Sequence, residues 1–546
     1  MNKTLLVCIA LLFSIVYNLD AQTQTVGTFL NSPETSEGYN LLAPNGSDFT
    51  YLIDNCGQVI NQWESEYKVG LSAYLLEDGS LLRTAQFISG DTPFSGGGTG
   101  GRVERYSWEG DLLWSMNWAD TLQHQHHDVE WMSNGNILIL GWERHSYEEA
   151  IAMGKTPNST GNDVWCTQIT EISPNENYGG EVVWQWSVWD HIVQDTDESL
   201  PDFAVISEEP RRFNINYTVN NGTNGLSPDW MHSNSVSYNE ALDQIMISSS
   251  KFSEIFIVDH STNTEEASGP AGDLLWRYGN PIVYDRGTID DRRLFHQHNA
   301  HWISEGLVGE GNVLVFNNGR NRPGGNASSV EELVLPEIVN GTYPIEQSQP
   351  FSPDTYTWRY PENLTGEFYA QNVSGAERQP NGNTLIAHGQ SGYAFEINPD
   401  KEIVFSYVNP ITVFGATIQG ADPGNNGMFR FPRYPIDYPG FEGRDMTPGD
   451  VLEENSWVTG CDSKVIDLDT PRTEAFPNPF TDFTTVNFKE EGVWSLYSTK
   501  GVLLDVGVSE SHNTVEIGSA LSRGCYFLRF TPKFTQNCYS IRVVKL

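Results

Sequence analysis

The chain has 546 residues, of which 38% are hydrophobic and 12% aromatic, and its formal net charge is −40. That hydrophobic content is sufficient for a packed interior, which excludes intrinsic disorder as the default state of the chain. The acidic excess argues against nucleic acid as a partner, because no surplus of Lys and Arg exists to neutralise phosphates.

The first residues have the pattern of a secretory signal peptide. Lys3 gives a positive start, an apolar core runs over 5–16, and small residues end at Ala21, so a signal peptide is predicted over 1–21. The apolar run is too short for a membrane span and no later run is long enough, so no transmembrane segment is expected. We therefore expect an exported protein.

A two-part pattern recurs about six times between residues 49 and 410. The first part is an Asn-Gly or Asp-Gly turn before a short apolar run, and the second is a Gly or acidic residue, apolar residues and Trp. The first part is clearest at 78–82, 134–138, 311–314 and 381–385, and the second at 57–63, 110–114, 180–184 and 272–276. Asn-Gly between alternating apolar residues indicates a hairpin, and recurring hairpins without helical periodicity predict a propeller.

The predicted fold class is all-β, a six-bladed β-propeller over 22–465 followed by a small C-terminal β-sandwich over 471–546. Two looser copies of the second part lie at 355–358 and at 402–405, where Phe405 replaces Trp, and six copies predict six blades. Residues 411–460 have no helical pattern, and we expect them to complete the last blade against the first. Short alternating strands after residue 471 predict the sandwich.

The C-terminal segment also resembles the sorting domain of the Bacteroidota type IX secretion system. The resemblance rests on the Pro-Asn-Pro-Phe opening at 477–480, the strand at 524–530 and the terminal Lys545-Leu546. It implies that the type IX machinery moves the protein from the periplasm across the outer membrane. Release or attachment to the cell surface would follow.

Five cysteines remain after the predicted signal peptide, and export permits disulfides. Cys525 and Cys538 lie near each other in sequence, and a bond between Cys56 and Cys461 would join the two ends of a closed ring. An odd count leaves one free thiol, most simply Cys166. The pairing itself stays open at this point.

Seven of the twelve histidines lie in three segments, 124–128, 229–236 and 296–302, and His388 lies in a further segment at 384–389. His127, His232 and His298 each precede the first strand of a hairpin in a different repeat. The innermost strand of each blade lines the central channel of a propeller, so equivalent positions converge on the axis. We expect Asp128 to orient a neighbouring imidazole.

Two other interpretations of these histidines are open. Each would be a solvated turn residue if the three did not converge. Alternate residues such as His296 and His298 share a face, and imidazole binds zinc or copper. No Glu or Asp recurs at a matching spacing, so no metal and no other cofactor is expected.

Several motifs within residues 25–460 resemble the arylsulfate sulfotransferases, which are propellers. They are the segments 51–57, 229–236, 297–300, 316–319 and 382–386. The resemblance implies transfer of a sulfuryl group from a phenolic sulfate ester to a phenol, without the nucleotide donor PAPS, through a sulfated histidine. A neutral imidazole is a competent nucleophile, and cationic groups must stabilise the transferred anion.

The resemblance assigns roles to individual residues. His232 and His298 are expected to contact the sulfuryl group and the leaving oxygen, Arg320 to clamp the anion, and His388 to act as the nucleophile. His298 is the next candidate for the nucleophile, because in the repeat of His388 the strand-start positions are Gln371, Asn372 and Ser374. Further candidate substrate-binding residues are His127, Asn234, His301, Asn318 and Arg322. Arg322 is also the alternative to Arg320 as the anion clamp.

The sequence therefore predicts a secreted or cell-surface aryl-sulfate sulfotransferase that acts on small phenols and aryl sulfates. Three alternatives are a sulfatase-like hydrolase, a non-catalytic surface propeller that binds glycan or protein, and a metal-dependent extracellular enzyme. Histidines scattered over the surface would favour the binding propeller, and bound metal would favour the third.

Overall fold

The structure, a computed structural model, describes residues 24–88, 96–157, 163–218 and 227–454 of the larger part of the chain. In the C-terminal part it describes 473–476, 483–488, 491–498, 503–509, 513–522, 524–533 and 539–545. The predicted signal peptide over 1–21, Cys461 and Cys538 lie outside these residues.

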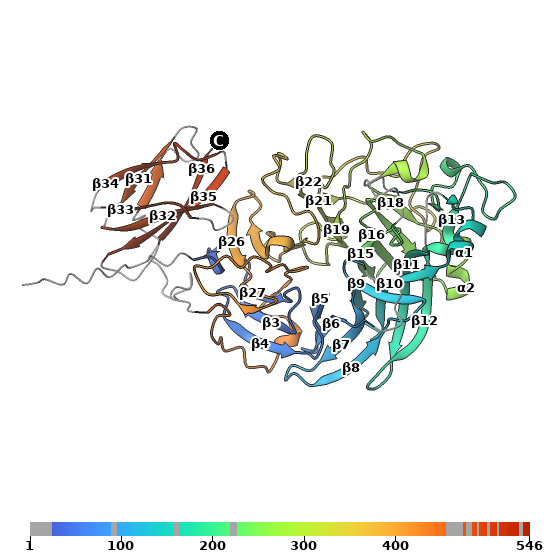
Figure 1. The fold of residues 1–546 in the computed structure, drawn as a ribbon, viewed down its shortest axis with the longest axis horizontal. Helices are drawn as coiled ribbons and strands as arrows, with labels where there is room; N and C mark the ends of the chain where they lie inside the picture. The colour runs from blue at the N-terminus through green and yellow to red at the C-terminus, as the bar shows by residue number, and fades with distance from the viewer. Residues whose placement is uncertain are drawn as a thin grey trace, which may run out of the picture.

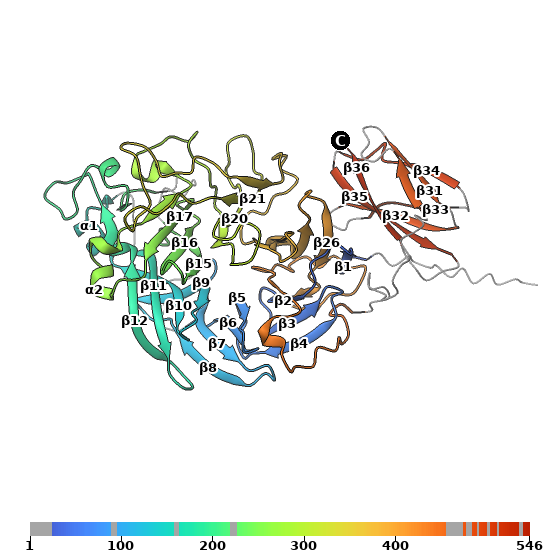
Figure 2. The same cartoon turned by 180° about the vertical axis from the view of Figure 1, so that it is seen from behind.

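Six antiparallel sheets form the predicted six-bladed propeller in the larger part of the chain (Figures 1 and 2). In spatial order the sheets are β29-β2-β3-β4, β5-β6-β7-β8, β9-β10-β11-β12, β15-β16-β17-β18, β19-β20-β21-β22 and β23-β24-β25-β26-β1. The first-named strand of each blade is the inner one, and β5, β9, β15, β19 and β23 pack side by side around the axis.

The strands of the first three blades are β2 (Tyr39–Leu42), β3 (Phe49–Asp54), β4 (Val59–Glu64), β5 (Val69–Leu75), β6 (Leu81–Gln86), β7 (Gly101–Tyr106), β8 (Leu112–Asn117), β9 (Gln123–Trp131), β10 (Ile137–His145), β11 (Val164–Pro174), β12 (Gly180–Ser187) and β29 (Arg433–Tyr434). Those of the other three are β15 (Ser233–Asn239), β16 (Gln244–Ser249), β17 (Glu254–Asp259), β18 (Trp276–Tyr278), β19 (His298–Trp302), β20 (Val313–Asn317), β21 (Ser329–Leu333), β22 (Trp358–Tyr360), β23 (Gly375–Arg378), β24 (Thr384–His388), β25 (Tyr393–Ile397), β26 (Ile403–Val408) and β1 (Gly27–Asn31).

Elements outside the blades are short in the described part of the chain. They are the pairs β13 (Ile192–Val193) with β14 (Phe213–Asn214) and β27 (Ile411–Thr412) with β28 (Gly415–Ala416), the helices α1 (Tyr147–Ala152) and α2 (Thr264–Ala267), and 3-10 turns such as η2 (Val188–His191). Among the described residues, helices are too short or too polar to cross a membrane.

The repeated tryptophans join neighbouring blades. Trp63, Trp114 and Trp276 are each at most 4% exposed, and each lies in the outermost strand of its blade. Their indole N–H groups donate 2.8 Å hydrogen bonds to backbone carbonyls of the following blade, at Ser107, Gly179 and Ser352 respectively. The sequence repeat therefore marks the inter-blade contact, where apolar burial and a satisfied indole N–H coincide.

Both ends of the propeller segment close the ring. Residues 411–460 were predicted to complete the last blade, but their strand β29 pairs with β2 in the first blade. The N-terminal strand β1 instead completes the last blade by pairing with β26. Arg433 of β29 forms a fully buried ion pair with Glu396 of β25 and donates a 2.8 Å hydrogen bond to Asn40 of β2. The closing segment thus links the first and last blades.

The C-terminal strands form two packed sheets beside the propeller, as predicted for the sandwich (Figure 1). One is β30 (Thr473–Phe476), β31 (Thr484–Phe488) and β34 (Asn513–Ile517), and the other is β33 (Leu503–Ser509), β32 (Gly492–Ser498), β35 (Gly524–Pro532) and β36 (Tyr539–Lys545). Their core includes Phe488, Leu528 and Phe530. Among the described cysteines, Cys166 is a free, buried thiol, and Cys56 belongs to a disulfide.

Candidate active site

A backbone irregularity recurs in the inner strands. Of the three histidines predicted to precede these strands, only His232 does so, because His127 lies inside β9 and His298 is the first residue of β19. The pairing register shifts between Val69 and Ala73 of β5, between Ser233 and Ser235 of β15, and between His298 and His301 of β19. In β9 the register shifts where the strand pairs with residues 139–141 of β10. His127 and His232 have φ values of 55° and 51°, a left-handed conformation that non-glycine residues rarely adopt. Such bulges re-aim side chains, and here they turn the histidines of successive blades toward one another.

Three predicted site histidines meet at this rim of the axis. The ring centroids of His127 and His232 lie 4.8 Å apart. His298 lies close to both. Burial is the main cause of the lowered pKa values of His298 and His127, but a charge on His232 further lowers the pKa of His298, and a charge on His298 further lowers that of His127. The three histidines therefore converge, as their equivalent places in the repeats predict.

His232 has a carboxylate partner. Nδ1 of His232 lies 2.5 Å from Oδ2 of Asp229, and Oδ1 of the same carboxylate accepts hydrogen bonds from Trp142 Nε1 and the His232 backbone N–H, both at 3.1 Å. Burial alone would raise the pKa of Asp229, but His232 and Lys251 hold it well below its usual range. The ionised Asp229 accepts the Nδ1–H of His232, which leaves Nε2 as the ring nitrogen that can take up or give a proton.

His298 is held as a neutral imidazole. Its Nδ1 lies 2.8 Å from Oδ1 of Asn318, whose Nδ2 donates to the carbonyls of Ala370 and Val373. Burial lowers the pKa of His298 to about 3, although the bond to Asn318 opposes the shift. Because Nδ1 donates to Asn318, Nε2 of His298 carries the free lone pair at neutral pH.

The rim around the histidines carries cations in spite of the acidic chain. Arg320 lies near His296 and contributes to lowering its pKa to about 3, after burial and Arg292. Within the described residues, the Arg320 guanidinium forms no hydrogen bond or ion pair. Arg322, by contrast, donates to Ser329 at 3.2 Å and pairs with Glu331 at 3.9 Å. Of the two arginines, Arg320 is therefore the one whose guanidinium can bind an anion without first breaking an ion pair.

A glycine-rich loop before β7 lies directly against two of the histidines. The carbonyl of Gly98 accepts a 2.8 Å hydrogen bond from the His127 N–H, and φ of Gly98 is +80°. A Cβ at Gly98 would lie 2.1 Å from Cε1 of His127, and one at Gly97 would lie 3.4 Å from Cε1 of His232. Only glycine permits this close approach.

His388, at the end of β24, has local partners for both ring nitrogens. Its Nε2 is 2.9 Å from the carbonyl of Tyr369 and its Nδ1 2.7 Å from Oγ of Ser391, so local contacts engage both ring nitrogens. At the strand start of its blade, Val373 and Ser374 have the positive φ values that His127 and His232 have elsewhere. In that blade a serine occupies the rim.

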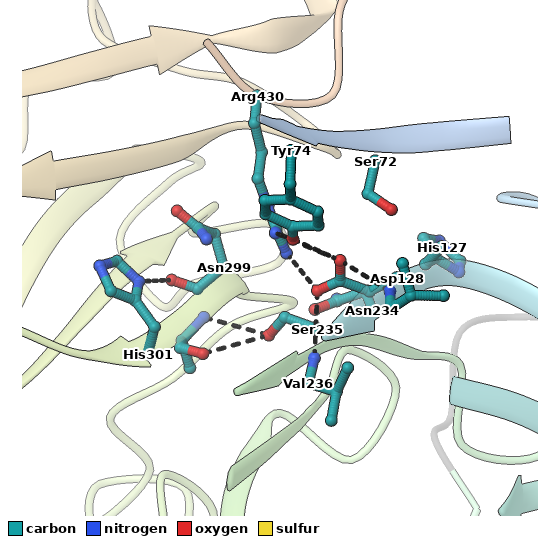
Figure 3. Close-up of polar contacts among 12 residues, drawn as sticks. Ser72, Tyr74, His127, Asp128, Asn234, Ser235, Val236, Asn299, His301 and Arg430 are labelled. Atoms are coloured by element: carbon teal, nitrogen blue, oxygen red, sulfur yellow. Dashed lines mark hydrogen bonds and ion pairs between the residues drawn. The ribbon is translucent and has the colours of Figure 1, made fainter. Parts of the chain in front are cut away.

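Two further predicted substrate contacts have other surroundings. Asn234 donates to the carbonyl of Gln297 at 2.8 Å and so connects two inner strands. His301 lies three residues after His298 on β19, with its Nδ1 3.2 Å from the carbonyl of Asn299, and burial lowers its pKa to about 4 (Figure 3).

Asp128 does not orient an imidazole as predicted. Its carboxylate accepts a 2.6 Å hydrogen bond from the Tyr74 hydroxyl and pairs with Arg430 at 2.6 Å (Figure 3). Asp229 is the carboxylate that orients a histidine, and its place three residues before His232 was a signal available in the sequence. Arg430 had no such signal, because it lies 302 residues from its partner.

The axis is built for one class of chemistry. The neutral His298 has a free lone pair, and His232 is oriented by a carboxylate. With the Arg320 guanidinium, which has no ion-pair partner among the described residues, they define a group-transfer site for an anionic group. The family comparison agrees: residues 22–430 match the arylsulfotransferase (ASST) family. The chain belongs to that family and is an aryl-sulfate sulfotransferase.

The C-terminal part matches a second family, the secretion system C-terminal sorting domain, over residues 474–542. The protein is therefore secreted or displayed at the cell surface by the type IX system. Among curated proteins none matches the chain.

Solved structures are similar only at low identity. A streptogramin B lyase is 9% identical, with a TM-score of 0.33, over 71% of this chain and 83% of that chain. The periplasmic gluconolactonase of Pseudomonas aeruginosa is 10% identical, with a TM-score of 0.34, over 88% and 99%. The β-propeller domain of Cps50 (Swd1) from Myceliophteria thermophila is 9% identical, with a TM-score of 0.38, over 76% and 94%.

Proposed function

We propose that the protein transfers a sulfuryl group from a phenolic sulfate ester to a phenol without a nucleotide donor, through a sulfated histidine. The observation that carries the proposal is the meeting of His298, with its free Nε2, and the Asp229–His232 pair at one rim of the axis. Their convergence also speaks against a purely binding propeller, for which scattered histidines were expected.

In the first half-reaction, Nε2 of His298 attacks the sulfur of the aryl sulfate as the bond between sulfur and the aryl oxygen breaks. The leaving aryl oxygen takes the Nε2 proton of a protonated His232, whose charge the Asp229 carboxylate stabilises. The product phenol departs and the sulfuryl group stays on His298. Arg320 offsets the negative charge of the sulfuryl oxygens.

In the second half-reaction, the now neutral His232 takes the proton of the acceptor phenol. The phenolate oxygen attacks sulfur, the bond between sulfur and Nε2 breaks, and His298 returns to its neutral form. His232 is again protonated, so protons and charges balance over the cycle.

We place the nucleophile at His298 in preference to His388 on two grounds. Local contacts hold both nitrogens of His388, whereas Asn318 holds only Nδ1 of His298. A neutral amide partner also leaves the imidazole uncharged at neutral pH, which suits a nucleophile, while a carboxylate partner suits the acid–base role of His232.

The test is release of 4-nitrophenol from 4-nitrophenyl sulfate by the purified chain, with and without phenol, followed by intact-mass measurement in the absence of acceptor. We expect release that rises with phenol and a sulfated protein that is absent in His298→Ala but present in His388→Ala. Loss of the adduct only in His388→Ala would return the nucleophile to that residue. Release unaffected by phenol would indicate hydrolysis, and no release from folded protein would contradict the proposal.

A further inference from the structure

A second group of reactive side chains lies on strands β10 and β11, away from the histidine rim. Glu143 and His145 are alternate residues of β10 and therefore share one face of the sheet. Cys166 of β11 is the register partner of Glu143 and lies on the same face. One ligating atom from each of the three residues lies within 4.8 Å of the other two.

The separations of these atoms match the edges of a metal coordination shell. Nε2 of His145 lies 3.2 Å, and Sγ of Cys166 3.7 Å, from Oε2 of Glu143. Usual zinc bond lengths and tetrahedral angles place ligating nitrogen and oxygen roughly 3.4 Å apart, and sulfur and oxygen roughly 3.6 Å apart. The two measured separations are thus close to those expected between zinc ligands.

Nε2 of His145 gives an independent indication. It is buried, and within the described part of the chain it has no hydrogen bond of acceptable geometry, although Oε2 of Glu143 is near. Trp189 of η2 stacks on the imidazole at 3.7 Å and holds the ring in place. A cation between Nε2 and the carboxylate would replace this poorly aligned contact with two coordination bonds.

The surroundings resemble the outer shell of a metal site. Ser187 donates a hydrogen bond to Oε2 of Glu143 and fixes the carboxylate. Glu143 is 25% exposed, which leaves a path for the ion and room for a water as fourth ligand. Cys166 is a free thiol in an exported protein, where unprotected thiols are exposed to oxidation.

We propose that Glu143, His145 and Cys166 bind a zinc ion, which ties β10 to β11 in the third blade. The combination of one sulfur, one nitrogen and one oxygen donor favours zinc over calcium or magnesium, which take oxygen ligands. Binding converts the Cys166 thiol to a thiolate and releases its proton to solvent. The ion has no part in the proposed sulfuryl transfer, because the three ligands lie on β10 and β11 and not on the inner strand β9 of this blade.

The test is titration of the chelator-treated full chain with Co²⁺, a spectroscopic substitute for zinc. We expect about one equivalent to produce the near-ultraviolet band of a cobalt–thiolate bond, which Zn²⁺ then displaces. Cys166→Ser should abolish the band. His145→Gln should weaken binding by more than the roughly 10- to 100-fold that loss of an outer-shell partner such as Ser187 costs.

A matched control is available at His260, which contacts Glu171 and Asp243 but no thiol. His260→Gln should leave the cobalt band unchanged, and Cys166→Ser should retain sulfuryl transfer, which shows that it is folded. A hydrogen-bonded cluster without metal affinity is the competing interpretation. No cobalt band, together with no rise in Tm on addition of Zn²⁺ to active protein, would overturn the proposal.

Discussion

Oδ2 of Asp229 lies 2.5 Å from Nδ1 of His232, three residues further along the chain and at the rim of the propeller axis. This contact fixes which nitrogen of His232 faces the axis. The same carboxylate accepts a hydrogen bond from Trp142 of the neighbouring blade, so the orientation of His232 depends on inter-blade packing.

Asp229→Asn is expected to lower kcat for 4-nitrophenyl sulfate by roughly 10²- to 10⁴-fold, the usual contribution of general acid–base catalysis. The amide preserves the volume of the side chain but no longer stabilises a protonated His232. Asp273→Asn is the matched control, since Asp273 contacts His191 at 2.9 Å away from the axis. Equal losses in the two variants would show that Asp229 has only a structural role.

Arg320→Met is expected to reduce kcat by about 10²- to 10³-fold, as loss of one oxyanion-stabilising donor does. Arg322→Met should instead lower the Tm and leave most of the transfer rate, because its guanidinium is already engaged by Ser329 and Glu331. Steady-state kinetics and thermal unfolding of both variants separate the two roles. The reverse pattern would assign the anion to Arg322.

Stability is expected to fall as pH decreases from about 6.5, the pKa of histidine in an unfolded chain. Burial lowers the pKa values of His126, His296 and His298 to about 3, so between pH 6.5 and 3 the unfolded chain binds protons that the folded chain does not. Each such group contributes up to about 1.4 kcal/mol per pH unit. Urea unfolding between pH 7 and 4.5 should give a shallower pH slope for His298→Asn than for the unsubstituted chain.

The pKa of His260 shifts in the opposite direction, so its contribution to stability has the opposite pH dependence. Burial would lower its pKa, but hydrogen bonds to Glu171 and Asp243 outweigh burial and raise it. Its contribution is therefore present below about pH 6.5 and is lost as pH rises through the folded-state pKa. His260→Asn should destabilise the protein more at pH 5.5 than at pH 8.5, and an unchanged difference would contradict this assignment.

Gly98→Ala is expected to impair both folding and transfer. Gly98 has φ of +80°, and its new Cβ would overlap the His127 ring. Gly135→Ala is the control, because Gly135 has a similar φ of +88° but nothing within 4 Å of its Cβ, so it isolates the backbone cost of about 1–2 kcal/mol. A larger loss of Tm and a lower kcat in Gly98→Ala than in Gly135→Ala would reflect displacement of His127.

Much of the fold was predictable because its signals are local. The turn at 134–136 connects β9 to β10, and Trp63, Trp114 and Trp276 recur in outer strands, each at a fixed place in its repeat. Residues 411–460 were expected to complete the last blade, whereas β29 joins the first and β1 completes the last, because strand pairing between the chain ends has no local signal. The role of Asp128 was predicted wrongly, because its partner Arg430 lies in that distant closing segment.

The sequence by itself determined the all-β propeller, the C-terminal sorting domain and the family. Hairpin turns, blade tryptophans and contiguous motifs are each contained in a short segment of the sequence. It also determined that His127, His232 and His298 occupy matching places. Only the tertiary structure decided that Asp229 orients His232 and that local contacts engage both nitrogens of His388. It also decided that, among the described residues, Arg322 has an ion-pair partner and Arg320 has none. Burial, tautomer and pairing depend on side chains brought together from different blades, and no local pattern in a sequence records them.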